Sequence, residues 1–150
     1  NHESLTGAEP RIAFLSFSTK GSANHKRVDK MREALDIARK ECPEYLMDGE
    51  LQFDAAFDTN IGKEKAPESD VAGRANVFIF PDLDSGNIGY KIAQQLGGYT
   101  ALGPLLQGLK SPMHDLSRGS SADDIVLVAA IATLQSVKNT KTDKEEYANV

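Results

Sequence analysis

The segment "ANVFIFPD" (residues 75–82) decides the fold of this chain. Its centre is an unbroken apolar, β-prone run, which is typical of a strand buried on both faces. Pro81 closes the run because proline has no N–H to continue a ladder of hydrogen bonds. Strands covered on both sides belong to parallel sheets whose faces carry helices, so this segment predicts an α/β protein.

The segments around this strand repeat the strand-and-helix alternation. Downstream, Asp84 or Ser85 is suited to cap a helix that runs to the Gly97-Gly98 pair. Upstream, "RIAFLSF" (residues 11–17) indicates a second buried strand. Residues 25–42 place apolar side chains on one helical face, and a proline follows.

The remaining segments carry weaker patterns. We expect a short strand in "EYLMDG", a short helix in "ELQFDAAF", a long polar surface loop over residues 58–73, a short strand and turn over residues 99–109, and a last helix from Asp123 to about Lys138. Strands that alternate with helices predict a largely parallel sheet. The order of the strands cannot be read from this pattern.

Composition limits the classes of function. The 150 residues suffice for one domain with a sizeable core, and 40% of them are apolar. The formal net charge of −5 argues against nucleic acid or an anionic membrane as partner, because both require a basic surface. Cys42 is the single cysteine, and no apolar run is long enough to span a membrane, so we expect a cytoplasmic protein. The chain begins without Met, which hints at a longer parent.

The stretch "HDLSRGSSADDI" (residues 114–125) has two interpretations. Ser120 or Ser121, followed by Asp123 or Asp124, matches a capping box at a helix start, and this structural interpretation is favoured by pattern alone. It leaves Arg118 unexplained. An arginine beside a glycine before a helix start can grip an anion.

The stretch "FPDLDSGNIGYK" (residues 80–91) is the second candidate site. It has the layout of a strand end, a turn and a helix start, where ligands of open α/β sheets bind. Asn87 and Lys91 are suited to hold a ligand there. The alternative is that Asp84 or Ser85 only caps a helix and Lys91 is solvated.

Other chemistry is poorly supported. Asp48, Asp54 and Asp58 lie close in sequence, but a polar rim explains them better than Mg²⁺ binding, and we predict no metal. The loop after residue 17 lacks the spacing of a nucleotide-binding P-loop. Cys42 is expected to pack rather than react.

Several long segments together resemble the phosphate acetyltransferase (phosphotransacetylase) family. They are "RIAFLSFSTKGSA", "DGELQFDAAF", "VFIFPDLDSGNIGYKIAQQLGG" and "LGPLLQGLKSPMHDLSRGSSADDI", in that order over about residues 10–137. The resemblance implies an α/β, three-layer architecture like that of isocitrate and isopropylmalate dehydrogenases, of which this chain is the C-terminal half. Residues 1–110 then correspond to a truncated middle domain. Residues 111–150 correspond to an active-site loop and a helix that returns toward the missing N-terminal domain.

The resemblance also implies a reaction, acetyl-CoA plus phosphate giving CoA plus acetyl phosphate, with no permanently bound cofactor. Asp124 matches the family's base for the CoA thiol, Ser117 a hydrogen-bonding serine, and Arg118 the arginine that holds phosphate and developing charge. With this substrate, we expect Ser85, Asn87, Tyr90 and Lys91 of the second candidate stretch to bind CoA or phosphate. A cytoplasmic homodimer active in acetate metabolism is expected, and the isolated chain is expected to be inactive.

Two alternatives stay open. The chain is also compatible with a non-catalytic module that senses acetyl-CoA and drives oligomerisation, as in malic enzyme fusions, and with a phosphate butyryltransferase.

The chemistry of proton transfer to Asp124 poses its own question. Transfer of a proton from a thiol with a pKa near 8.5 to a carboxylate with an ordinary pKa of about 3.9 is unfavourable by about 6 kcal/mol. Burial of Asp124, stabilisation of the thiolate by Arg118, or concerted proton transfer would each close this gap.

Overall fold

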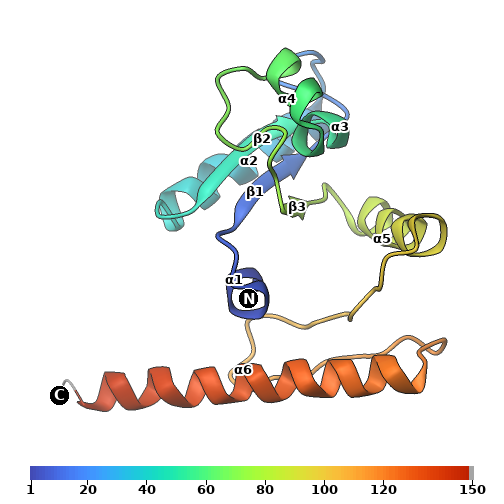
Figure 1. The fold of residues 1–150 in the computed structure, drawn as a ribbon. Coiled ribbons are helices and arrows are strands. Elements are labelled where there is room, and N and C mark those ends of the chain that lie inside the picture. The colour runs from blue at the N-terminus through green and yellow to red at the C-terminus, as the bar shows by residue number, and fades with distance from the viewer. Residues whose placement is uncertain (149–150) are drawn as a thin grey trace. The chain divides into compact units, whose positions relative to one another are not determined.

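The computed structural model describes residues 1–148 (Figure 1), with side chains described as far as residue 137. The chain forms two compact units, Asn1–Lys91 and Ile92–Val150. The boundary between them falls inside one helix, α5 (Leu83–Gly97).

The first unit is built on a three-stranded parallel sheet. Its strands are β1 (Arg11–Leu15), β2 (Leu46–Leu51) and β3 (Val77–Ile79), in the spatial order β2-β1-β3. Ala13, at the centre of β1, lies opposite Asp48 on β2 and Phe78 on β3. The predicted α/β class, the three strands and their parallel pairing are therefore confirmed.

Helix α2 (Lys26–Glu41) packs on one face of this sheet. Its buried side chains Met31 and Leu35 cluster with Phe14 of β1, as the apolar spacing predicted. His25 caps the start of the helix, because its Nδ1 accepts a hydrogen bond from the backbone N–H of Arg27 at 3.1 Å. It ends at Glu41, two residues before Pro43.

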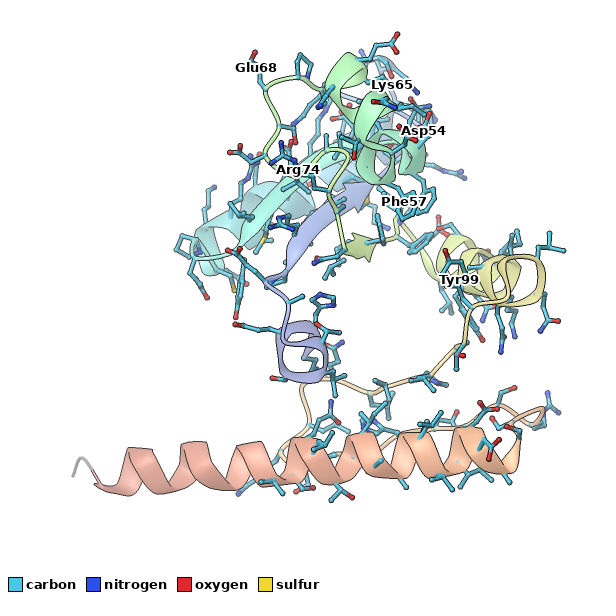
Figure 2. All side chains as sticks on the ribbon, viewed as in Figure 1. Asp54, Phe57, Lys65, Glu68, Arg74 and Tyr99 are labelled. Atoms are coloured by element: carbon cyan, nitrogen blue, oxygen red, sulfur yellow. The ribbon has the colours of Figure 1, made fainter. Side chains whose placement is uncertain are left out.

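The opposite face is covered by α3 (Phe53–Phe57), α4 (Thr59–Lys65) and the segment that follows them. The expectation of a long surface loop over residues 58–73 is wrong. The Asp58 carboxylate caps α4 by accepting from two backbone N–H groups, and Val71 is buried against the sheet. Lys65 of α4 also reaches Asp54 of α3 at 2.7 Å (Figure 2).

The predicted cap of α5 is also wrong. The Asp82 carboxylate accepts the backbone N–H of Ser85 at 2.8 Å. Asp82 therefore caps the helix in place of Asp84 or Ser85. The cap lies one residue before Leu83 because the helix begins earlier than its apolar pattern suggests. The predicted stop is confirmed: α5 ends at Gly97, and Gly98 has a positive φ of 69°. A left-handed glycine of this kind is a common way to end a helix.

The second unit contains the long helix α6 (Ala122–Ala148). It extends beyond the expected end near Lys138 because no proline or glycine interrupts this part of the chain. Residues 99–109 form no strand. Leu105 makes one isolated antiparallel bridge with His114, because Gly103 and Pro104 break the backbone there. A short helix that the sequence analysis did not predict, α1 (His2–Thr6), lies in the first unit.

Candidate functional site

The middle strand β1 is a switch point in the topology of the sheet. The connection through α2 leads to β2 on one side of β1, and the connection through α3 and α4 leads to β3 on the other side. The two neighbouring connections therefore leave a crevice outside the carboxyl ends of β1 and β3, which is where open α/β sheets bind ligands.

A hollow of about 390 Å³ lies at this position. The residues that follow β1 form one side of it and the residues that follow β3 form the other, so both strand ends open into it. The hollow is lined by Leu15, Ser16, Phe17, Arg27, Phe53, Phe80, Pro81, Asp82 and Ser85.

Asp82 and Ser85 are joined at the rim of the hollow. The Asp82 carboxylate accepts both the backbone N–H of Ser85 at 2.8 Å and its hydroxyl at 2.7 Å. These hydrogen bonds lower the pKa of Asp82, with Lys30 and Arg27 adding to the effect. Asp82 is therefore a fixed negative charge, and the Ser85 hydroxyl proton is already donated to it.

The other predicted binding residues of α5 do not line the hollow. Asn87, Tyr90 and Lys91 are exposed and have the i, i+3, i+4 spacing of one helical face. The Lys91 Nζ lies 5.1 Å from the centroid of the Tyr90 ring. Because Ser85 and Asn87 are two residues apart, they point roughly 160° away from each other. The structure thus separates Ser85 from the other three.

The loop after β1 is held rigidly by a buried carboxylate that the sequence analysis missed. Glu50 is 2% exposed and accepts from the Ser18 hydroxyl at 2.9 Å and the Gly21 N–H at 2.8 Å. The Arg32 Nε donates to its other oxygen, Oε2, at 2.8 Å. Although burial opposes ionisation, these donors lower the pKa of Glu50 to about 2. The loop that carries Phe17 is therefore anchored to β2.

The hollow also shows which residues the sequence analysis overlooked. Phe17, Arg27 and Phe53 come from three separate segments, and none of them belongs to a recognisable motif. Phe80 lay inside the quoted candidate stretch but was assigned only to the strand. Their positions in the sequence could have identified Phe17 and Phe80, because each of them ends an apolar strand pattern.

In the second unit, Ser117 and Arg118 form a tight turn. The Ser120 N–H donates to the Ser117 carbonyl at 2.9 Å, and the Gly119 N–H approaches the Ser117 hydroxyl oxygen at 3.3 Å. Arg118 lies at the exposed tip of this turn. Among residues 1–137, no carboxylate forms an ion pair with its guanidinium, so its donors face solvent.

Asp124 follows in the first turn of α6. Its Oδ2 accepts the Ser121 N–H at 2.8 Å and the Ser121 hydroxyl at 2.9 Å. These bonds form the capping box that the structural interpretation predicted, with Ser121 as the cap. They lower the pKa of Asp124 below its ordinary value.

The residues that the structure describes hold neither a metal-binding cluster nor a membrane-spanning helix. Neither histidine, cysteine nor carboxylate side chains gather in threes as a metal site requires, within the part of the chain that the structure describes. In the same part, every helix is too short or too polar to cross a bilayer.

Fold and site together define an open α/β protein with a ligand crevice at a switch point and an exposed arginine before a capped helix. Comparison with known proteins specifies the family: the model "Phosphate acetyl/butaryl transferase" matches residues 1–133, and the chain belongs to this family.

Individual relatives agree with this assignment. The chain is 51% identical to the phosphate acetyltransferase of Bacillus subtilis over 91% of its own length and 42% of the relative's. It is 57% identical to that of Paracoccus denitrificans, over 88% and 42%. A crystal structure of a phosphotransacetylase from Streptococcus pyogenes matches with a TM-score of 0.86 and 56% identity, over 91% of this chain and 42% of that one. The chain thus spans about two fifths of the length of these relatives.

Proposed function

We propose that the full-length protein transfers an acetyl group reversibly between CoA and inorganic phosphate, giving acetyl phosphate. One observation carries this proposal: Arg118 stands exposed on a tight turn shortly before Asp124, in a chain 51% identical to a phosphate acetyltransferase. An arginine whose donors face solvent is suited to bind a phosphate in bidentate fashion.

The proposed roles divide the chemistry among three residues. Arg118 holds phosphate and stabilises the negative charge that develops on the carbonyl oxygen during attack. Ser117 donates a hydrogen bond to the reacting thioester. Asp124 accepts the proton of the CoA thiol when acetyl phosphate is the acyl donor. The thiol sulfur then forms the new C–S bond as the C–O bond to phosphate breaks, and no acyl-enzyme is required.

The state of Asp124 favours concerted proton transfer. Its hydrogen bonds with Ser121 lower its pKa, which widens the mismatch with the thiol instead of closing it. Burial of Asp124 within this chain is not the solution, because the residue is only half-buried. A carboxylate of this kind removes the proton most effectively while the sulfur attacks, so that free thiolate does not accumulate.

The wider assignments are part of the same proposal. CoA or phosphate is bound by Ser85, Asn87, Tyr90 and Lys91, and no cofactor is permanently bound. Residues 1–110 form the middle α/β domain of an isocitrate dehydrogenase-like, three-layer protein, and residues 111–150 return toward a further domain. The protein is a cytoplasmic homodimer of acetate metabolism. Support for partner surfaces comes from Leu83 and Leu96, which are 84% and 85% exposed, because large exposed apolar side chains often mark interaction surfaces.

The test is an assay for acetyl-CoA formation from acetyl phosphate and CoA with the full-length protein. We expect turnover that depends on both substrates and that the isolated 150-residue chain lacks. Binding of acetyl-CoA without turnover would favour the sensing module. Faster reaction with butyryl phosphate than with acetyl phosphate would favour a butyryltransferase.

A further inference from the structure

We infer that the hollow between the ends of β1 and β3 holds the adenine base of the coenzyme, with Arg27 and Lys30 facing its phosphates. This inference rests on the proposed function for the identity of the nucleotide. It places the adenine part of the substrate in the hollow. It also gives a binding role to four residues that the proposed reaction does not use, Phe17, Phe53, Phe80 and Arg27.

The lining of the hollow is aromatic and open to solvent. Phe17, Phe53 and Phe80 are 56%, 53% and 37% exposed. Phe53 also stacks on Phe57, with ring centroids 5.5 Å apart, and contacts the Phe78 ring at 5.2 Å. Five of the chain's six phenylalanines therefore belong to the hollow or to the rings beside it. Such rings are suited to stacking with a base, because every base presents a flat π-face.

The rings are held in place before any ligand arrives. Phe17 packs edge-on against His25, with centroids 5.9 Å apart, and its loop is anchored by the buried Glu50. Phe53 is fixed by its stack on Phe57. A rigid aromatic wall loses little conformational entropy on binding, which favours a rigid planar ligand.

Charge at the rim favours phosphate on the same ligand. Arg27 lines the hollow, and Lys30 donates to the Pro81 carbonyl at 2.5 Å. Asp82 is the one carboxylate among the lining residues, and its Oδ1 is occupied by Ser85. Among the lining residues one cation, Arg27, stands with one carboxylate that Ser85 already engages, and Lys30, bonded to the lining Pro81, adds a second cation beside the rim in a chain whose net charge is −5.

The lining is less suited to the pantetheine arm, whose amides require hydrogen-bonding partners. The Ser85 hydroxyl donates to Asp82, and the Ser16 hydroxyl accepts from the Ser18 N–H at 3.3 Å. Among the lining residues, the side-chain donors left for amides are the Ser16 hydroxyl and the Arg27 guanidinium, whereas a base needs mainly ring faces. The volume of the hollow also lies in the range of small-ligand sites.

The test compares acetyl-CoA with S-acetylpantetheine, which lacks the nucleotide, as substrates of the full-length protein. Phe53→Leu keeps an apolar side chain but removes the ring, and Arg27→Ala removes the charge. Each is expected to lower kcat/KM for acetyl-CoA about tenfold and to leave kcat/KM for S-acetylpantetheine unchanged. Tyr45→Leu and Arg74→Ala remove an exposed ring and an exposed cation elsewhere in the first unit and should change neither value (Figure 2 labels Arg74).

A second measurement separates this inference from the proposed function. Adenosine 3′,5′-bisphosphate is titrated into each variant by calorimetry, which needs no catalysis. Weaker binding to Phe53→Leu and Arg27→Ala, but not to the controls, supports the site even if the protein shows no turnover. If turnover is normal while both variants keep the wild-type ratio between the two thioesters and the wild-type affinity for the bisphosphate, the inference is wrong and the proposed function stands.

Discussion

Ser121 and Asp124 cap each other at the start of α6. The Asp124 Oδ2 accepts both the N–H and the hydroxyl of Ser121, at 2.8 and 2.9 Å, and the Asp124 N–H points back at the Ser121 hydroxyl oxygen at 3.2 Å. The carboxylate proposed as the catalytic base is therefore also a structural cap. Its orientation and its basicity are both set by one serine.

Ser121→Ala should separate these two roles. Loss of the hydroxyl removes one of the donors that lower the pKa of Asp124, so this pKa should rise toward its ordinary value. The helix start should lose about 1 kcal/mol of stability. Carbon-detected NMR titration of the Asp124 carboxyl and hydrogen exchange in the first turn of α6 measure the two effects. Ser120→Ala is the matched control, and an equal shift in that variant would contradict the assignment.

Asp124→Asn should lower kcat by about two to four orders of magnitude, because an amide cannot accept the thiol proton. The KM values should change little, since Asn can still accept the Ser121 hydrogen bonds and keep the cap. Steady-state kinetics of the full-length protein measures this. Near-normal turnover would remove Asp124 as the base.

Arg118→Lys should lower kcat/KM for phosphate about a hundredfold or more. A lysine keeps the charge but cannot present the planar pair of donors that a phosphate and a developing oxyanion engage. Initial rates at varied phosphate concentration measure the loss. Arg74→Lys, at another exposed position, should be silent; wild-type kinetics for Arg118→Lys would mean that this arginine does not bind the transferred group.

Glu50→Gln should destabilise the fold in a pH-dependent way. The folded pKa of about 2 lies below the ordinary 4.5, so the ionised carboxylate stabilises the fold above pH 4.5. That stabilisation, about 3 kcal/mol at full size, is lost as the pH falls from 4.5 through 2. Urea unfolding at pH 7 should show the full difference from wild type, and the difference should shrink by pH 3. A difference that is independent of pH would contradict the linkage, and the exposed Glu68→Gln should stay within about 0.5 kcal/mol of wild type.

Gly62→Ala should be strongly destabilising although the residue lies in a helix. A Cβ at Gly62 would stand 2.6 Å from the backbone nitrogen of Gly73, which cannot move aside as a side chain would. We expect a loss of about 2–3 kcal/mol in urea unfolding. In Gly86→Ala the new methyl meets Phe80 at an ordinary 3.5 Å, and the better helix propensity should stabilise α5 by up to about 1 kcal/mol. A Gly62→Ala variant as stable as wild type would show that the close approach of Gly62 to Gly73 does not matter.

The sequence by itself determined the features that arise from interactions between near neighbours in the chain. The helix over residues 26–41, the strand before Pro81, the end of α5 at Gly97 and the capping box of Ser121 and Asp124 all follow from contacts within a few residues. The same reasoning failed over residues 58–73. There a polar pattern concealed a helix whose place depends on the contact between Gly62 and Gly73.

Only the tertiary structure decided what those elements bring together. Phe17 and Phe80 meet because β1 and β3 are neighbours in a parallel sheet, and Phe53 joins them from α3, which packs against β1. Glu50 anchors the loop of Phe17 because β2 lies on the other side of β1. Such contacts depend on strand order, and strand order is set by the packing of distant apolar faces, which local periodicity does not encode.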